Sequence, residues 1–174
     1  MSELSLEVLR QWNREKFHYI WQNAKRQESD GLTAEEQKLA EIMLAHSEEY
    51  FNQFELADLL GDHEFNPGGE VDPFLHVTFH AIVENQIEGR DPIEAVQFYN
   101  AMRKKDCSRR EAIHLLMAIF IYVFLPVLKE KRPFRLDTYC KLLKDYKLRK
   151  PEKIYDLLEN EPDLIAGEEP NAKG

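Results

Sequence analysis

Apolar residues recur every three or four positions along most of this 174-residue chain, which is the spacing that places side chains on one face of an α-helix. No segment alternates apolar and polar residues between hairpin turns, as a half-buried strand would. The pattern predicts helices over residues 6–28, 34–54, 73–88, 92–105, 109–128, 137–147 and 151–159. We therefore expect an all-α, single-domain bundle of about six or seven helices.

Residues that cap or break helices support these boundaries. Thr33 with Glu36, and Ser108 with Glu111, have the spacing of a capping box, in which each side chain bonds to the backbone of the other residue. At Asp72-Pro73, a good N-cap precedes a residue whose missing N–H and fixed φ suit the first helical position. Further start signals stand at Asp91-Pro92, Asp137 and Lys150-Pro151.

The segment Ala112–Leu128 is an almost unbroken apolar run that contains His114 and Pro126. A membrane-spanning helix needs about 20 apolar residues, and somewhat shorter runs are often buried core helices. The run therefore predicts a central helix buried by the others, and no membrane span. Residues 1–161 form the predicted helical domain, and the acidic residues 162–174, with their Pro and Gly, are a predicted disordered tail.

The charge of the chain narrows the choice of partners. Lys and Arg number 23 against 32 Asp and Glu, which gives a net charge of −9. An acidic protein repels the phosphate backbone, so nucleic acid is not an expected partner. Cys107 and Cys140 show no spacing of a disulfide framework or thiolate metal site, and the first residues lack a secretory signal. The sequence thus predicts a cytoplasmic protein.

Two histidines four residues apart, His76 and His80, stand in the predicted helix 73–88, and Glu84 follows four residues later. Residues four apart share a helical face, which is metal-ligand spacing. Both imidazoles lie on or beside the apolar face, where each needs a partner, either a metal ion or an ordinary hydrogen bond. His76 and Glu84 are separated by roughly 12 Å along the axis, so one ion could bind His76 with His80, or His80 with Glu84. All three residues could serve only a two-metal centre, unless Glu84 supports the ion from outside.

A second carboxylate and imidazole, Glu111 and His114, stand three residues apart at the start of the apolar run. This spacing occurs in carboxylate-bridged di-metal helix bundles, although such bundles use the pair twice. Glu111 is equally explained by the capping box with Ser108. His46 lies on the apolar face of the predicted helix 34–54 and is a further candidate, either as a ligand or as a packed core histidine.

These residues together resemble a bacterial family, domain of unknown function 1841, over about residues 32–146. The matching motifs are Asp72-Pro73-Phe74-Leu75-His76-x-x-x-His80-x-x-x-Glu84-x-Gln86 and Glu111-Ala112-x-His114. The family commonly has Asn at the place of Asp72, and its His-Pro-Glu-Tyr-His segment is represented here only by the first histidine, His46. The resemblance implies a small, helical, cytoplasmic bacterial protein and brings no established activity.

Two functions fit the sequence. In the first, His76, His80 and His114 bind a divalent transition metal, zinc, iron, manganese or nickel, and Glu84, Glu111 or His46 completes the ligand shell. Such a protein could be a hydrolase or an oxidoreductase of unknown substrate. In the second, the protein is a non-enzymatic interaction module. Its histidines form a buried hydrogen-bond network, and its acidic surface meets a protein partner or a second copy of the chain.

Overall fold

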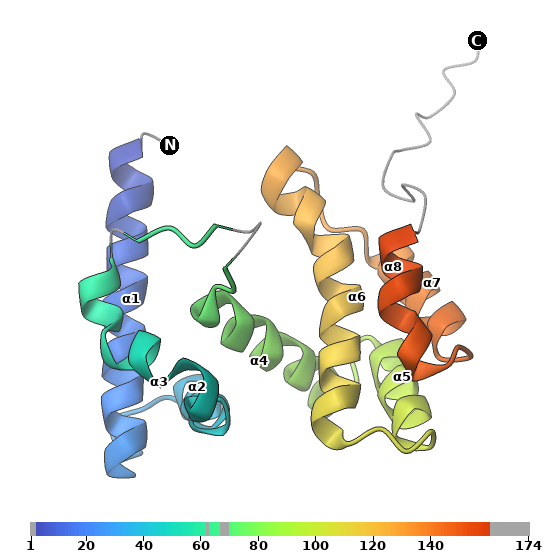
Figure 1. The fold of residues 1–174 in the computed structure, drawn as a ribbon, viewed down its shortest axis with the longest axis horizontal. Coiled ribbons are helices and arrows are strands. Elements are labelled where there is room, and N and C mark those ends of the chain that lie inside the picture. Colours follow the sequence, from blue (N-terminus) through green and yellow to red (C-terminus); the bar gives the residue numbers. More distant parts are fainter. Residues whose placement is uncertain (1–2, 62, 67–69, 161–174) are drawn as a thin grey trace. The chain divides into compact units, whose positions relative to one another are not determined.

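A computed structural model describes residues 3–61, 63–66 and 70–160 of the chain, and Figure 1 shows its helices. Every regular element within these residues is a helix, so the all-α prediction is confirmed. The elements are α1 (Glu3–Arg26), α2 (Ala34–Ala45), α3 (Ser47–Glu55), η1 (Ala57–Leu60), α4 (Pro73–Gly89), α5 (Ile93–Arg103), α6 (Arg109–Glu130), α7 (Leu136–Tyr146), η2 (Pro151–Lys153) and α8 (Ile154–Asn160).

The chain divides into two compact units, Met1–Ala81 and Ile82–Gly174, and the division falls within α4. The first unit holds α1, α2, α3, η1 and the first turns of α4. The second holds the end of α4 and the helices from α5 to α8. The predicted single domain over residues 1–161 stays a prediction, and the predicted tail at 162–174 lies outside the described residues.

Aromatic side chains build the core of the first unit. Trp21 of α1 is 1% exposed and its ring lies 5.3 Å from that of Phe54 in α3, which is fully buried. The indole Nε1 donates to Glu55 Oε2 at 2.7 Å, and the Lys25 ammonium binds the same oxygen. A buried indole N–H needs such an acceptor. Glu55 therefore joins α3 to the face of α1 that carries Trp21.

The single helix predicted over residues 34–54 is wrong, because the chain breaks at His46 into α2 and α3. His46 has φ −108° and ψ 11°, outside the helical region. Its backbone N–H and its ring Nδ1 both donate to the carbonyl oxygen of Ile42. A side chain that bonds to a carbonyl of the preceding turn competes with the regular helical ladder and favours a bend. The apolar periodicity continues through the break and so conceals it.

Arg14 of α1 holds the segment that leads into α4. The residue is 6% exposed, and its Nη1 donates to the carbonyl oxygen of Leu60 at 3.2 Å. Its guanidinium lies 4.2 Å from the centre of the Phe74 ring and 3.9 Å from Asp72. Asp72 in turn accepts from the backbone N–H groups of Phe74 and Leu75, which confirms it as the N-cap of α4. The 3-10 helix that ends at Leu60 was not predicted.

Helix α6 forms the centre of the second unit, where it contacts α5, α7 and α8. Its residues Ala112, Ile113, Leu116 and Ile119 are at most 1% exposed. The stretch Arg109–Val127 is long and apolar enough to cross a membrane, and 44% of it is buried within the structure. A core helix of a soluble protein meets the same criteria. Its contacts with α5, α7 and α8 and its buried residues confirm the predicted central helix, and the absence of a membrane span stays a prediction.

The remaining helix starts test the capping rules. Ser108 and Glu111 form the predicted capping box. Asp137 is not an N-cap, because α7 already begins at Leu136 and the Arg135 carbonyl accepts the first helical bond, from the Tyr139 N–H. Asp137 instead lies in the first turn, 3.6 Å from the Arg135 guanidinium. The predicted short last helix is present as η2 followed by α8.

Candidate metal site

Three of the predicted site histidines gather in the first unit. The ring centre of His46 lies 5.0 Å from that of His76 and 4.9 Å from that of His80, and both contacts are edge-on. His76 and His80 are one turn apart on α4, with ring centres separated by 6.3 Å. The break between α2 and α3 therefore brings the third imidazole to the pair that the sequence spacing identifies.

The hydrogen bond of His46 defines which nitrogen can bind a ligand. Nδ1 lies 2.8 Å from the carbonyl oxygen of Ile42. Since a carbonyl only accepts, Nδ1 carries the hydrogen of the neutral ring and Nε2 carries the lone pair. Metal-binding histidines commonly donate their other ring nitrogen to a carbonyl or carboxylate in this way. The ring of His46 is thus oriented as a ligand through Nε2.

His46 and His80 are the buried members of the cluster, with 2% and 4% of their surface exposed. Each offers one ligand nitrogen, and these two atoms lie within 4.8 Å of each other. His76 is partly exposed and its ring centre lies 5.7 Å from that of Tyr50. The cluster therefore has a buried pair and a third imidazole nearer to solvent.

The backbone beside this cluster departs from helical geometry twice. Besides His46, Tyr50 in α3 has φ −126° and ψ 18°. Residues held in sparsely populated backbone regions cost free energy and gather at functional sites. The carbonyl of His46 accepts from the Tyr50 N–H at 3.0 Å, so the two departures are joined. The unusual backbone is what places His46 and Tyr50 beside α4.

Glu84 lies in the second unit and is 7% exposed. Its Oε2 accepts from Arg109 Nη2 at 3.0 Å. This ion pair supplies the positive partner that a buried carboxylate requires. Sequence reasoning missed Arg109, although the need of a buried Glu84 for a cation was a signal that one of the nearby arginines would meet it.

Glu111, also in the second unit, completes the capping box. Its Oε2 accepts from the Ser108 N–H at 2.7 Å, and its own N–H donates to the Ser108 hydroxyl. Hydrogen bonds from Ser108 lower the pKa of Glu111 below its ordinary value. The capping explanation that the sequence left open is therefore confirmed, and metal ligation by Glu111 stays a prediction.

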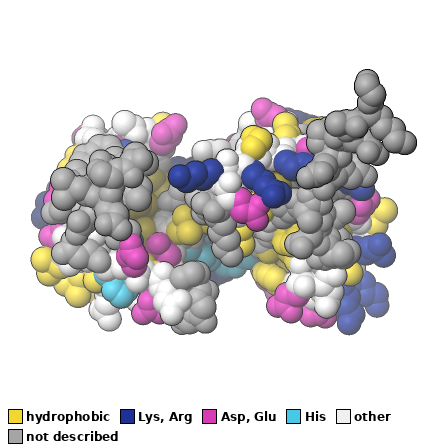
Figure 2. All heavy atoms as spheres, turned by 90° about the horizontal axis from the view of Figure 1, so that it is seen from above, with side chains coloured by type: hydrophobic (Ala, Val, Ile, Leu, Met, Phe, Trp, Pro, Cys, Tyr) yellow, Lys and Arg dark blue, Asp and Glu magenta, His cyan; other side chains and the backbone are white. Residues whose placement is uncertain are grey.

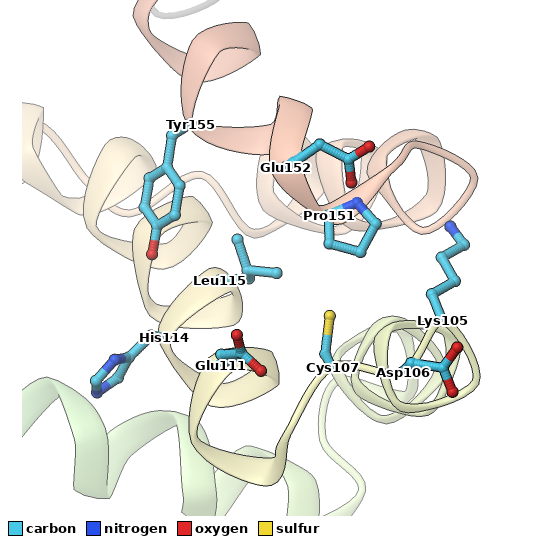
Figure 3. A pocket seen from close by; sticks show the side chains of 9 residues that line it. All are labelled: Lys105, Asp106, Cys107, Glu111, His114, Leu115, Pro151, Glu152 and Tyr155. Carbon is cyan, nitrogen blue, oxygen red and sulfur yellow. The ribbon is translucent and has the colours of Figure 1, made fainter.

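His114 of α6 borders a cavity of about 430 Å³ in the second unit. The cavity is lined by Lys105, Asp106, Cys107, Glu111, His114, Leu115, Pro151, Glu152 and Tyr155. Figure 3 shows the imidazole of His114 pointing away from the sulfur of Cys107. Burial, with the charge of Glu111 as a second cause, raises the pKa of Cys107. The thiol therefore stays protonated at neutral pH and is a poor ligand or nucleophile.

The fold and the cluster define an all-α protein with three imidazoles gathered at a helix break. Residues 9–145 match the family described as Domain of unknown function (DUF1841). The chain belongs to this family, which confirms the resemblance seen in the sequence. No curated protein and no solved structure matches the chain. The family carries no assigned activity, so a function has to be argued from the site.

Proposed function

We propose that this protein binds a divalent transition metal ion through His46 and His80, with His76 beside them as a third candidate ligand. The observation that carries the proposal is the Nδ1 bond of His46 to the Ile42 carbonyl at 2.8 Å, which leaves Nε2 as the ligand atom. That ring lies edge-on to both histidines of α4. An ordinary core histidine needs hydrogen bonds, but it does not need two further imidazoles beside it.

The donor set fits the proposed ions. Neutral imidazole suits zinc, iron, manganese and nickel. A tetrahedral ion with metal–nitrogen bonds of about 2.0–2.1 Å holds two nitrogens roughly 3.3 Å apart. The ligand nitrogens of His46 and His80 lie within 4.8 Å, so they would have to move closer together to hold one ion. The bound ion would supply Lewis-acid chemistry.

The remaining predicted ligands lie in the second unit and are tested one at a time. Glu84 already accepts from Arg109, and Glu111 from Ser108, so each would have to exchange a hydrogen bond for a metal bond. His114 lines the cavity of the second unit. Separate measurements of the metal content of His114→Ala, Glu84→Gln and Glu111→Gln test these three predicted ligands.

Elemental analysis of the purified protein tests the proposal. The protein should carry a transition metal, and His80→Ala should lower its occupancy. His63→Ala is the matched control, because His63 has a 43% exposed side chain and lies outside the cluster. If no variant or wild-type sample carries metal, and His80→Ala only destabilises the fold by about 1–3 kcal/mol, the histidines form a buried hydrogen-bond network instead.

A further inference from the structure

The first unit carries a groove of about 320 Å³ between α1 and α2. Its apolar lining includes Ala24, Leu32, Ala40 and Leu44, and Leu44 is 42% exposed. The exposed carboxylates Glu28 and Glu41 also border it. The groove thus combines an apolar floor with an acidic rim, which suits an apolar side chain flanked by cations.

The second unit presents such a side chain. Leu148, in the turn between α7 and η2, is 78% exposed, the highest value among the large hydrophobic residues that the structure describes. Lys147 precedes it, and Arg149 and Lys150 follow. The Lys105 ammonium donates to the carbonyl oxygens of Lys147 and Arg149, which fixes the turn on both sides of the leucine.

Basic residues gather around this turn. Lys105, just after the end of α5, joins Lys147, Arg149 and Lys150 at the turn, while the Leu148 N–H donates to the carbonyl oxygen of Asp145. Figure 2 shows Lys and Arg side chains clustered at the right-hand end of the second unit. An exposed leucine costs little when alone, but a leucine held rigidly among cations matches a specific kind of surface.

The two units also differ in net charge. Residues 1–81 carry 6 Lys and Arg against 16 Asp and Glu, whereas residues 82–174 carry 17 against 16. The first unit is therefore strongly acidic and the second is nearly neutral, so the basic character is local to the turn around Leu148. Such a basic patch on one copy is attracted to the acidic unit of another copy.

We infer that copies of this chain associate head to tail, with Leu148 of one copy seated in the α1–α2 groove of a second copy. Arg149 and Lys150 of the first copy then face Glu28 and Glu41 of the second. The two surfaces differ, so the interface is heterologous, and it forms a ring or an open chain according to the rotation between copies. The inference does not depend on the metal site.

Sedimentation velocity of the full chain over a range of concentrations tests this interface. We expect reversible self-association that weakens at high salt, since charge pairs at the rim are screened. Leu148→Asp should abolish it. Leu59→Asp is the matched control, because Leu59 is 76% exposed and lies outside both surfaces, and it should leave association unchanged. Circular dichroism checks that both variants keep their helices.

A charge exchange makes the test specific to the two surfaces. Glu41→Lys and Lys150→Glu should each weaken self-association, and a mixture of the two variants should associate again, because Lys at 41 then meets Glu at 150. A chain that stays monomeric at every concentration overturns the inference. So does a Leu148→Asp variant that associates like the wild type, or binding of Leu148 to anionic vesicles without self-association.

Discussion

The Nδ1 atom of His46 donates to the carbonyl oxygen of Ile42, one helical turn earlier, at 2.8 Å. This bond lies where α2 ends, places the hydrogen of the neutral ring on Nδ1, and leaves the lone pair on Nε2, the nitrogen that we propose as the ligand atom. One interaction therefore links the local fold to the proposed metal site. His46→Ala should lower transition-metal affinity by about tenfold or more.

The same substitution should also destabilise the metal-free protein. The Ile42 carbonyl keeps the backbone N–H of His46 but loses the ring donor, and a lost hydrogen bond of this kind is worth about 0.5–1.5 kcal/mol. Urea denaturation of the metal-free protein measures this, and His18→Ala serves as the control on a partly exposed histidine of α1. Equal metal affinity in His46→Ala and wild type would contradict the role given to His46.

Arg14 should be sensitive to replacement by lysine. Its guanidinium lies over the Phe74 ring and donates to the Leu60 carbonyl. A lysine ammonium has neither the flat surface that stacks on a ring nor the fixed arrangement of N–H donors of a guanidinium. We expect Arg14→Lys to lower the free energy of unfolding by about 1–3 kcal/mol. Arg26→Lys, at an exposed position on the same helix, should change it by less than about 0.5 kcal/mol. Similar losses in both variants would argue against this role.

Glu55 should make stability depend on pH in the acid range. Hydrogen bonds from Lys25, the larger cause, and from Trp21 lower its pKa from the ordinary 4.5. Because the folded pKa is depressed, the stabilisation is complete above about 4.5 and is lost as pH falls through the folded value. Glu55→Gln should therefore flatten the fall in thermal stability below that pH. Glu15→Gln, an exposed change on α1, should keep the wild-type slope.

Variants at the start of α6 distinguish the capping role of Glu111 from a role as a metal ligand. Ser108→Ala removes the acceptor of the Glu111 N–H and should cost about 1 kcal/mol of stability. Glu111→Gln should be nearly neutral, since glutamine also completes a capping box. Its metal content should equal that of the wild type. A marked loss of metal in Glu111→Gln would instead make Glu111 a ligand.

Local chemistry made most helix boundaries predictable. The cap of α4 at Asp72 and the capping boxes at Thr33 and Ser108 depend on residues within three positions of each other. The break at His46 was hidden, because the ring-to-carbonyl bond that causes it leaves the apolar periodicity intact. The start of α7 was also predicted wrongly. Asp137 is a good cap by residue type, but the first helical hydrogen bond runs from the Tyr139 N–H to the Arg135 carbonyl, so the helix begins before Asp137.

The site was predictable to the extent that it is local. The spacing of His76 and His80 and the apolar-face position of His46 are visible in the sequence. The contact of His46 with α4 depends on tertiary packing, as does the ion pair of Glu84 with Arg109, whose partners stand 25 residues apart. The apolar periodicity of the sequence predicts neither the contact of His46 with α4 nor the ion pair of Glu84 with Arg109.

Calorimetric titration of the metal-free protein with Zn²⁺ tests the central claim most directly. The histidine cluster predicts binding that is saturable at about one ion per chain, is retained in His63→Ala, and is abolished in a His46→Ala, His80→Ala double variant. Circular dichroism must show that the double variant keeps its helices. The absence of Zn²⁺ binding in the wild type, or equal binding in the folded double variant, would contradict a metal site built on His46 and His80.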